Sequence, residues 1–155
     1  MSRQSFGVPM TGPKAVVIPA TGTTALSQET HANRLLLLTN AGVAYTFNLP
    51  RATGSGDVYE FLSPQARTSG SVIINASAAV PSNIIVGTVW QHSASTDTLV
   101  QFSSTVNDII TLNITTTGGA TAGDHLVLVD GAPDTWYVVD AMFTTSGNPA
   151  TPFSG

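Results

Sequence analysis

Three histidines and nine acidic residues are the side chains of this sequence that could act as acids, bases or metal ligands. His125 follows Asp124 directly, and with a distant serine the two could form a hydrolytic triad. Neighbouring residues of a strand point to opposite faces, however, so Asp124 is poorly placed to orient His125, and there is no Gly-x-Ser-x-Gly motif. We therefore expect His125 to be a strand residue at an edge or interface, and the protein not to be an enzyme.

The same residues do not predict a metal or cofactor site. The three histidines lack a spacing that would place two ligands on one strand face. Asp130, Asp134 and Asp140 could meet around a hairpin, but turn capping and solubility account for them more simply. The glycine-rich segment 118–123 lacks the lysine and the following helix of a phosphate-binding loop. Without cysteine, the chain has neither thiolate ligands nor disulfides.

A receptor- or glycan-binding β-module is the alternative function. Tyr59, Trp90, Trp136 and Tyr137 could form an aromatic platform on a β-sandwich. A competing interpretation divides the last long strand into a core face and a covered interface face. The two alternating sets are Trp136, Val138 and Met142, and Tyr137, Val139 and Phe143.

Composition favours association with other protein surfaces. Charged residues make up 9% of the 155 residues and hydrophobic residues 42%, whereas ordinary soluble domains carry about 25% charged residues. Polarity comes mostly from 22 Thr and 15 Ser, whose hydroxyls do not repel a partner. The net charge of -4 and five scattered basic residues argue against nucleic-acid binding. We find no apolar run long enough to span a bilayer and no signal-peptide pattern, so we expect no membrane association.

Short apolar segments separated by Gly, Pro, Asn and Thr predict an all-β, antiparallel β-sandwich or jelly-roll-like fold of about ten short strands with little or no helix. The expected strands span residues 15–19, 34–39, 44–49, 58–62, 71–75, 83–91, 98–103, 108–115, 124–130 and 135–143.

Two segments alternate clearly: 45–49 with Tyr, Phe and Leu on one face, and 110–114 with Ile, Leu and Ile. The continuous apolar runs 35–38 and 126–129 predict strands covered on both faces. Gly131 to Asp134 predicts a hairpin turn, and Asn40 to Gly42 a turn between two strands.

The two ends differ from the middle in being rich in Gly, Pro, Ser and Thr. We divide the chain into an N-terminal extended arm (1–13), a β-sandwich domain (14–143) and a C-terminal extended tail (144–155). Phe6 and Phe153 are isolated large apolar residues in the two ends. Such ends are either frayed or ordered against a neighbour.

Two blocks of the sequence resemble a known family. They are Glu29 to Arg34 followed by Asn48-Leu-Pro-Arg-Ala-Thr-Gly-Ser-Gly-Asp-Val-Tyr-Glu-Phe61, and Thr117 to Trp136 with Ala150 to Ser154. They are similar to small virion proteins of tailed bacteriophages described as head decoration or capsid cement proteins. The resemblance implies a structural protein that binds the outside of the capsid, often as a trimer, and ties neighbouring capsomers together, with no catalytic residues.

On this basis the expected partners are the major capsid protein and further copies of the chain, most simply a homotrimer. The expected location is the capsid exterior of the virion, after assembly in the host cytoplasm. In the alternative function, the receptor- or glycan-binding β-module would belong to a phage fibre or tail spike. The candidate interface residues are Phe6, Leu35, Leu37, Trp90, His125, Tyr137 and Phe153.

Overall fold

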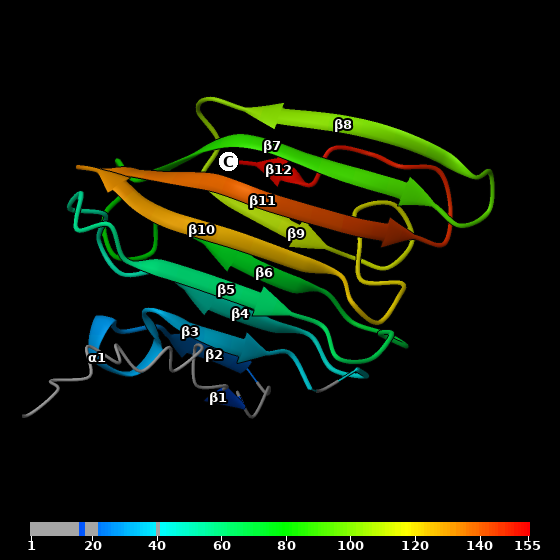
Figure 1. Ribbon diagram of the computed structural model, residues 1–155, viewed down its shortest axis with the longest axis horizontal. Helices are drawn as coiled ribbons and strands as arrows, with labels where there is room; N and C mark the ends of the chain where they lie inside the picture. Colours follow the sequence, from blue (N-terminus) through cyan, green and yellow to red (C-terminus); the bar gives the residue numbers. More distant parts are fainter. Residues whose placement is uncertain (1–15, 18–21, 40) are drawn as a thin grey trace, which may run out of the picture.

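The protein is an all-β sandwich of two packed sheets, which confirms the predicted fold class (Figure 1). The computed structural model describes residues 16–17, 22–39 and 41–155. The seven-stranded sheet contains, in spatial order, β1 (Val16–Val17), β3 (Arg34–Leu37), β5 (Val58–Leu62), β10 (His125–Ala132), β11 (Thr135–Thr145), β7 (Ile84–Ser93) and β8 (Thr98–Ser104). The five-stranded sheet contains β12 (Phe153–Ser154), β9 (Ile109–Leu112), β6 (Val72–Asn75), β4 (Tyr45–Asn48) and β2 (Gly22–Ala25). A single helical turn, α1 (Gln28–His31), connects β2 to β3.

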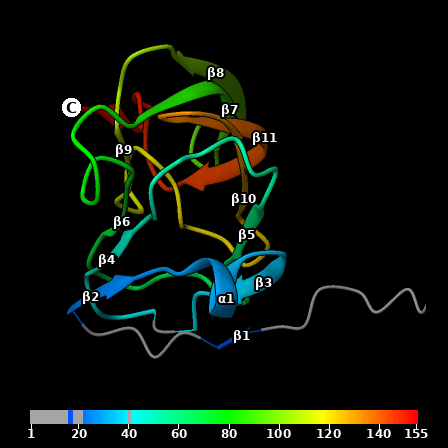
Figure 2. The same ribbon diagram turned by 90° about the vertical axis from the view of Figure 1, so that its left-hand side faces the viewer.

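The first half of the chain winds between the two layers. Successive strands from β1 to β6 lie alternately in the two sheets, and the end-on view shows the chain crossing between them (Figure 2). Each strand therefore pairs in parallel with the strand two places earlier, with Leu36 beside Phe61 and Phe47 beside Ile74. The expected antiparallel pattern holds for β5 with β10 and for the β10–β11 hairpin, but not for these strands. The segment between β3 and β4, where a turn at 40–42 was expected, thus connects strands of different sheets, and Asn40 lies outside the described residues.

The core lies between the two inner faces. Tyr45, Phe47 and Leu49 are all buried, as their alternation predicts. The rings of Phe47 and Phe61 lie 5.7 Å apart, one from each sheet, and so join the two layers. Strand β2 was not expected because its sequence, Gly-Thr-Thr-Ala, has no large apolar side chain, and it lies at the edge of its sheet. Its place is set by pairing with β4.

An irregularity in β11 changes which side chains face the core. Val127 lies opposite Asp140 and Leu128 opposite Val138, so Val139 is an extra residue on β11. The alternation predicted for this strand fails beyond that point, because the extra residue shifts its phase by one. Phe143 is buried and Met142 is exposed. On the neighbouring strand, Gly87 has φ +139°, and a Cβ there would lie 2.8 Å from the Cβ of Val138.

The C-terminal residues belong to the sandwich. The expected boundary at residue 143 lies within β11, which continues to Thr145, and β12 adds an edge strand to the five-stranded sheet. Phe153 pairs with Ile110 and is 6% exposed. Residues 144–155 therefore do not form a free tail. The expected N-terminal arm, 1–13, lies outside the described residues.

We expect Phe153→Ala to lower the free energy of unfolding by about 3 kcal/mol, because it removes a buried ring and leaves a cavity. Urea denaturation followed by tryptophan fluorescence measures the change. Val106→Ala is the control, since Val106 is 71% exposed, and we expect a change within about 0.5 kcal/mol. Equal stabilities for the two variants would show that the C-terminal strand adds nothing to the fold.

Candidate interaction surface

The outer face of the seven-stranded sheet carries rows of apolar side chains. The strand register places Leu37, Leu62, His125, Met142 and Trp90 side by side across five strands. Side chains opposite one another on neighbouring strands lie about 5 Å apart at Cβ. Trp90 is 43% exposed and Met142 38% exposed, which is high for residues of this size. The row is therefore a continuous, partly uncovered surface.

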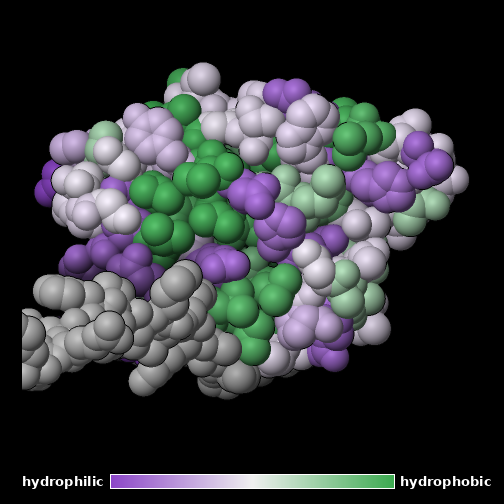
Figure 3. All heavy atoms as spheres, viewed as in Figure 1, coloured by the Kyte–Doolittle hydropathy of each residue, from purple (hydrophilic) through white to green (hydrophobic). Residues whose placement is uncertain are grey.

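A second row crosses the same face nearer the other end of the strands. It consists of Val58, Val129, Tyr137 and Val86. Tyr137 is 41% exposed, and the extra residue of β11, Val139, is 64% exposed. Figure 3 looks onto this sheet and shows groups of hydrophobic side chains separated by hydrophilic ones. We call the two rows and Val139 the outer face.

Polar side chains lie between the two rows. The register places Glu60 beside Val127, and Val127 beside Asp140. His125 Nε2 lies 3.1 Å from Asp140 Oδ2, and its Nδ1 lies 3.2 Å from the carbonyl oxygen of Gly123. His125 is therefore held by Asp140 across the hairpin. This polar pair on an apolar face would favour one orientation of a partner over others.

The structure brings most of the predicted interface residues together. Leu35, Leu37, Trp90, His125 and Tyr137 lie on strands of the seven-stranded sheet and are half-buried or exposed. Leu36 and Leu38 are buried in the core, whereas Leu35 and Leu37 are half-buried. The runs 35–38 and 126–129 were predicted to be covered on both faces. This stays a prediction, because a partner would have to cover their half-buried outer side chains. Phe153 lies in the core, and Phe6 lies outside the described residues.

One residue of this surface, Met142, was missed because the extra residue of β11 shifts the alternation. Simple alternation groups Met142 with the buried Trp136, whereas it groups Val139 with the exposed Tyr137, in agreement with the structure. The exposed aromatic platform is also smaller than expected, since Trp136 and Tyr59 are 0% and 1% exposed. The sequence signal of the bulge is Val139 itself, which lies between two stretches of regular alternation. A valine at such a place does not by itself show that a strand contains a bulge.

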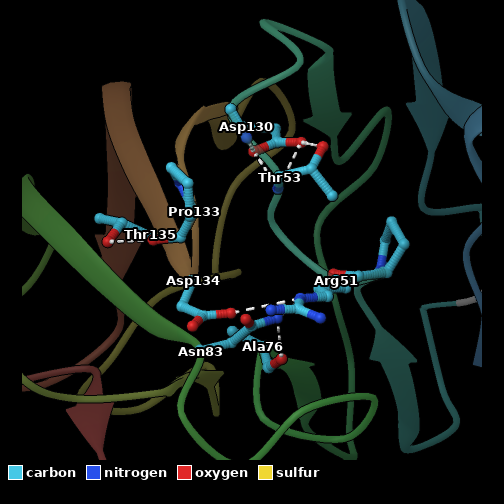
Figure 4. A network of polar contacts seen from close by, with 10 residues as sticks. Arg51, Thr53, Ala76, Asn83, Asp130, Pro133, Asp134 and Thr135 are labelled. Atoms are coloured by element: carbon cyan, nitrogen blue, oxygen red, sulfur yellow. Dashed lines mark hydrogen bonds and ion pairs between the residues drawn. The ribbon is translucent and has the colours of Figure 1, made fainter.

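A second polar feature closes the end of the sandwich near the β10–β11 turn. Asp130 accepts hydrogen bonds from the amides of Thr53 (2.8 Å) and Gly54 (2.6 Å) and lies 2.8 Å from the Ser55 hydroxyl. Figure 4 shows Asp130 facing Thr53, with the nearby Arg51–Asp134 ion pair at 3.4 Å. Burial alone would raise the pKa of Asp130, but these hydrogen bonds outweigh it and hold the pKa below its ordinary value.

The three aspartates considered as a cluster have separate partners. Asp130 binds the 53–55 loop, Asp134 pairs with Arg51, and Asp140 with His125. Among the described residues there is no group of three or more His, Cys, Asp or Glu side chains that could hold a metal ion. Asp124 is buried and accepts from the amides of Gly119 and Thr144. Burial raises the pKa of Asp124 despite these bonds.

We expect Asp130→Asn to destabilise the protein at neutral pH by about 1 to 3 kcal/mol, because a carboxylate bound to backbone amides is lost. The folded-state pKa lies below the unfolded one, so the ionised carboxylate stabilises the fold at higher pH. This contribution is lost as the pH falls below about 4 and through the folded pKa. Urea denaturation at a series of pH values should therefore show the gap between wild type and variant narrowing in acid. Glu29→Gln, in exposed α1, is the control, and a gap that does not change with pH would contradict the assignment.

Comparison with known proteins identifies no family for this chain. No protein-family model matches the sequence, and no significant match is found among curated proteins. In the part of the chain that the structure describes, no helix is both long and apolar enough to cross a membrane.

Proposed function

We propose that the protein is a structural virion protein that binds the outer surface of a phage capsid and cements neighbouring capsomers. The observation that carries the proposal is the outer face, where Trp90, Tyr137, Val139 and Met142 are 38 to 64% exposed. Exposed apolar rows bordered by polar residues mark sites of protein association. Aromatic residues and methionine are also the residue types enriched in protein interfaces.

The choice of a capsid as the partner is supported by the resemblance of residues 29–34, 48–61 and 117–136 to head decoration proteins. The chemistry agrees with such a role. An open sheet face buries apolar area without a deep pocket, and the His125–Asp140 pair supplies orientation. Many copies around a shell add avidity, so each contact needs only modest affinity.

Association into a homotrimer is part of the proposal: the number of subunits comes from the resemblance, and the edge strand β8 supports association between copies. β8 ends the seven-stranded sheet, and its sequence, Thr-Leu-Val-Gln-Phe-Ser-Ser, has no charged residue or proline. Natural edge strands are usually protected from pairing by such residues. Leu99 on this strand is 55% exposed. The edge is therefore open to a neighbouring copy while the outer face is open to the shell.

We expect the double variant Val139→Lys, Met142→Lys to lose capsid binding by at least tenfold, because two charges would be buried against apolar surface. Co-sedimentation with mature capsids that lack the protein measures the affinity. The matched control is Val106→Lys, which adds a charge at a more exposed valine in the loop between β8 and β9. Wild-type binding by the double variant, or no binding by the wild type, would refute the proposed docking face.

We expect Leu99→Lys to dissociate the oligomer, because a lysine on an edge strand opposes strand pairing. Sedimentation-velocity ultracentrifugation measures the molecular mass of wild type and variant at the same concentrations. Val106→Lys again serves as the control for an added charge. A wild type that sediments as a monomer at every concentration would rule out the trimer.

A further inference from the structure

A third row of side chains crosses the seven-stranded sheet between the two apolar rows of the outer face. The register places Leu35 beside Glu60, Glu60 beside Val127, and Val127 beside Asp140. Glu60 alternates with buried residues of β5, so its side chain lies on the same side of the sheet as the rest of this face. The row thus places two carboxylates inside the proposed docking surface.

The four positions nearest to Glu60 on this face hold apolar side chains. Leu35 and Val127 are its neighbours across the strands, and Val58 and Leu62 lie two residues away on β5 itself. Glu60 is half-buried, and its carboxylate forms no hydrogen bond or ion pair with any of the described residues. Acidic groups that lose contact with water are normally paired, so this carboxylate lacks the partner that its surroundings call for.

The other carboxylate of the row differs from Glu60 in both respects. The side chain of Asp140 is 67% exposed, and its Oδ2 lies 3.1 Å from Nε2 of His125. Asp140 would therefore keep a hydrogen-bond partner if another protein covered the face. Glu60 has no comparable partner in the described chain, so it is the charged group that a docked protein must satisfy.

The basic residues of the described chain lie away from this face. Arg34 is in register with the buried Tyr59, so it lies on the opposite side of the sheet. Arg51 pairs with Asp134 at 3.4 Å, and Arg67 is 4% exposed. No other lysine or arginine occurs in residues 16–17, 22–39 and 41–155. Within these ranges the outer face therefore carries carboxylates but neither lysine nor arginine.

Charge then limits what can cover the face. Docking would remove water from Glu60, which is strongly unfavourable for an ionised group unless a cation meets it. A nucleic acid or an anionic lipid surface would be repelled by Glu60 and Asp140. A second copy placed face to face would bring further carboxylates to the contact. A neutral donor would form a hydrogen bond but would leave the charge uncompensated.

We propose that the outer face docks on a basic protein surface, and that an arginine or lysine side chain of the partner pairs with Glu60. This inference rests on the proposed function and adds the chemistry of the partner, an apolar patch of the capsid surface that contains a cation. Arginine suits this place best, because its planar guanidinium can donate two parallel hydrogen bonds to one carboxylate. Its aliphatic stem can also pack against Leu35 and Val127.

Glu60→Gln tests the pairing through the direction of its effect on capsid binding. Glutamine has nearly the same shape and still accepts a hydrogen bond, but it carries no charge. If a cation of the shell meets Glu60, the variant leaves that cation buried without a counter-charge, and we expect binding to weaken about tenfold or more. If the shell offers only apolar or neutral groups there, loss of the buried charge makes binding tighter. Co-sedimentation with mature capsids that lack the protein measures either change.

Two further variants make the test specific. Glu29→Gln removes the same charge from exposed α1, and we expect it to bind like the wild type. Glu60→Lys should weaken binding more than Glu60→Gln, because like charges would then meet. Since Glu60 has no partner in the described chain, Glu60→Gln should unfold at the same urea concentration as the wild type.

The outcomes separate this inference from the proposed function. Unchanged or tighter binding by Glu60→Gln, while the wild type binds and Val139→Lys, Met142→Lys does not, would overturn the inference and leave the docking face in place. An equal loss of binding in Glu29→Gln would also overturn it, because net charge and not Glu60 would then be responsible. Absence of capsid binding by the wild type would overturn the proposed function, and the inference with it.

Discussion

Burial of the inner faces of the two sheets against each other is the interaction on which the rest of the structure depends. The chain has no disulfide and few charges, so packing supplies most of its stability. Phe47 and Phe61 meet across the layers, and Trp136 packs against Tyr59 within the wider sheet. The winding of the first six strands builds both layers at once, because each crossing places the next strand in the other sheet.

Where the chain crosses between the layers, some backbone amide and carbonyl groups have no partner in either sheet. Buried polar side chains form hydrogen bonds with these groups. Asp130 binds the amides of Thr53 and Gly54 across 77 and 76 positions of sequence. Asp124 binds Gly119 and Thr144 in the same way. Asn83 donates to the carbonyl oxygen of Ala76 at 3.1 Å. Because a buried polar group without a partner is costly, these bonds determine the paths of the loops.

The same architecture creates the proposed docking face. The five-stranded sheet covers the inner face of the wider sheet, and the outer face remains half-exposed in the described chain. The outer face is largely apolar, as suits contact with a protein shell.

The sequence by itself determined the fold class and most of the strands. Alternation at Tyr45, Phe47 and Leu49 identified an inner face correctly, because a period of two reports which side of a strand is buried. Alternation also placed Tyr137 among the interface candidates, and the continuous apolar run 35–38 placed Leu35 and Leu37 there. The same period cannot reveal partners, since it is identical in parallel and antiparallel pairs. Only the tertiary structure decided the winding of β1 to β6, the phase change at Val139, the burial of Phe153, and the meeting of Ser55 with Asp130. Each of these depends on contacts between residues far apart in the chain, which local pattern does not encode.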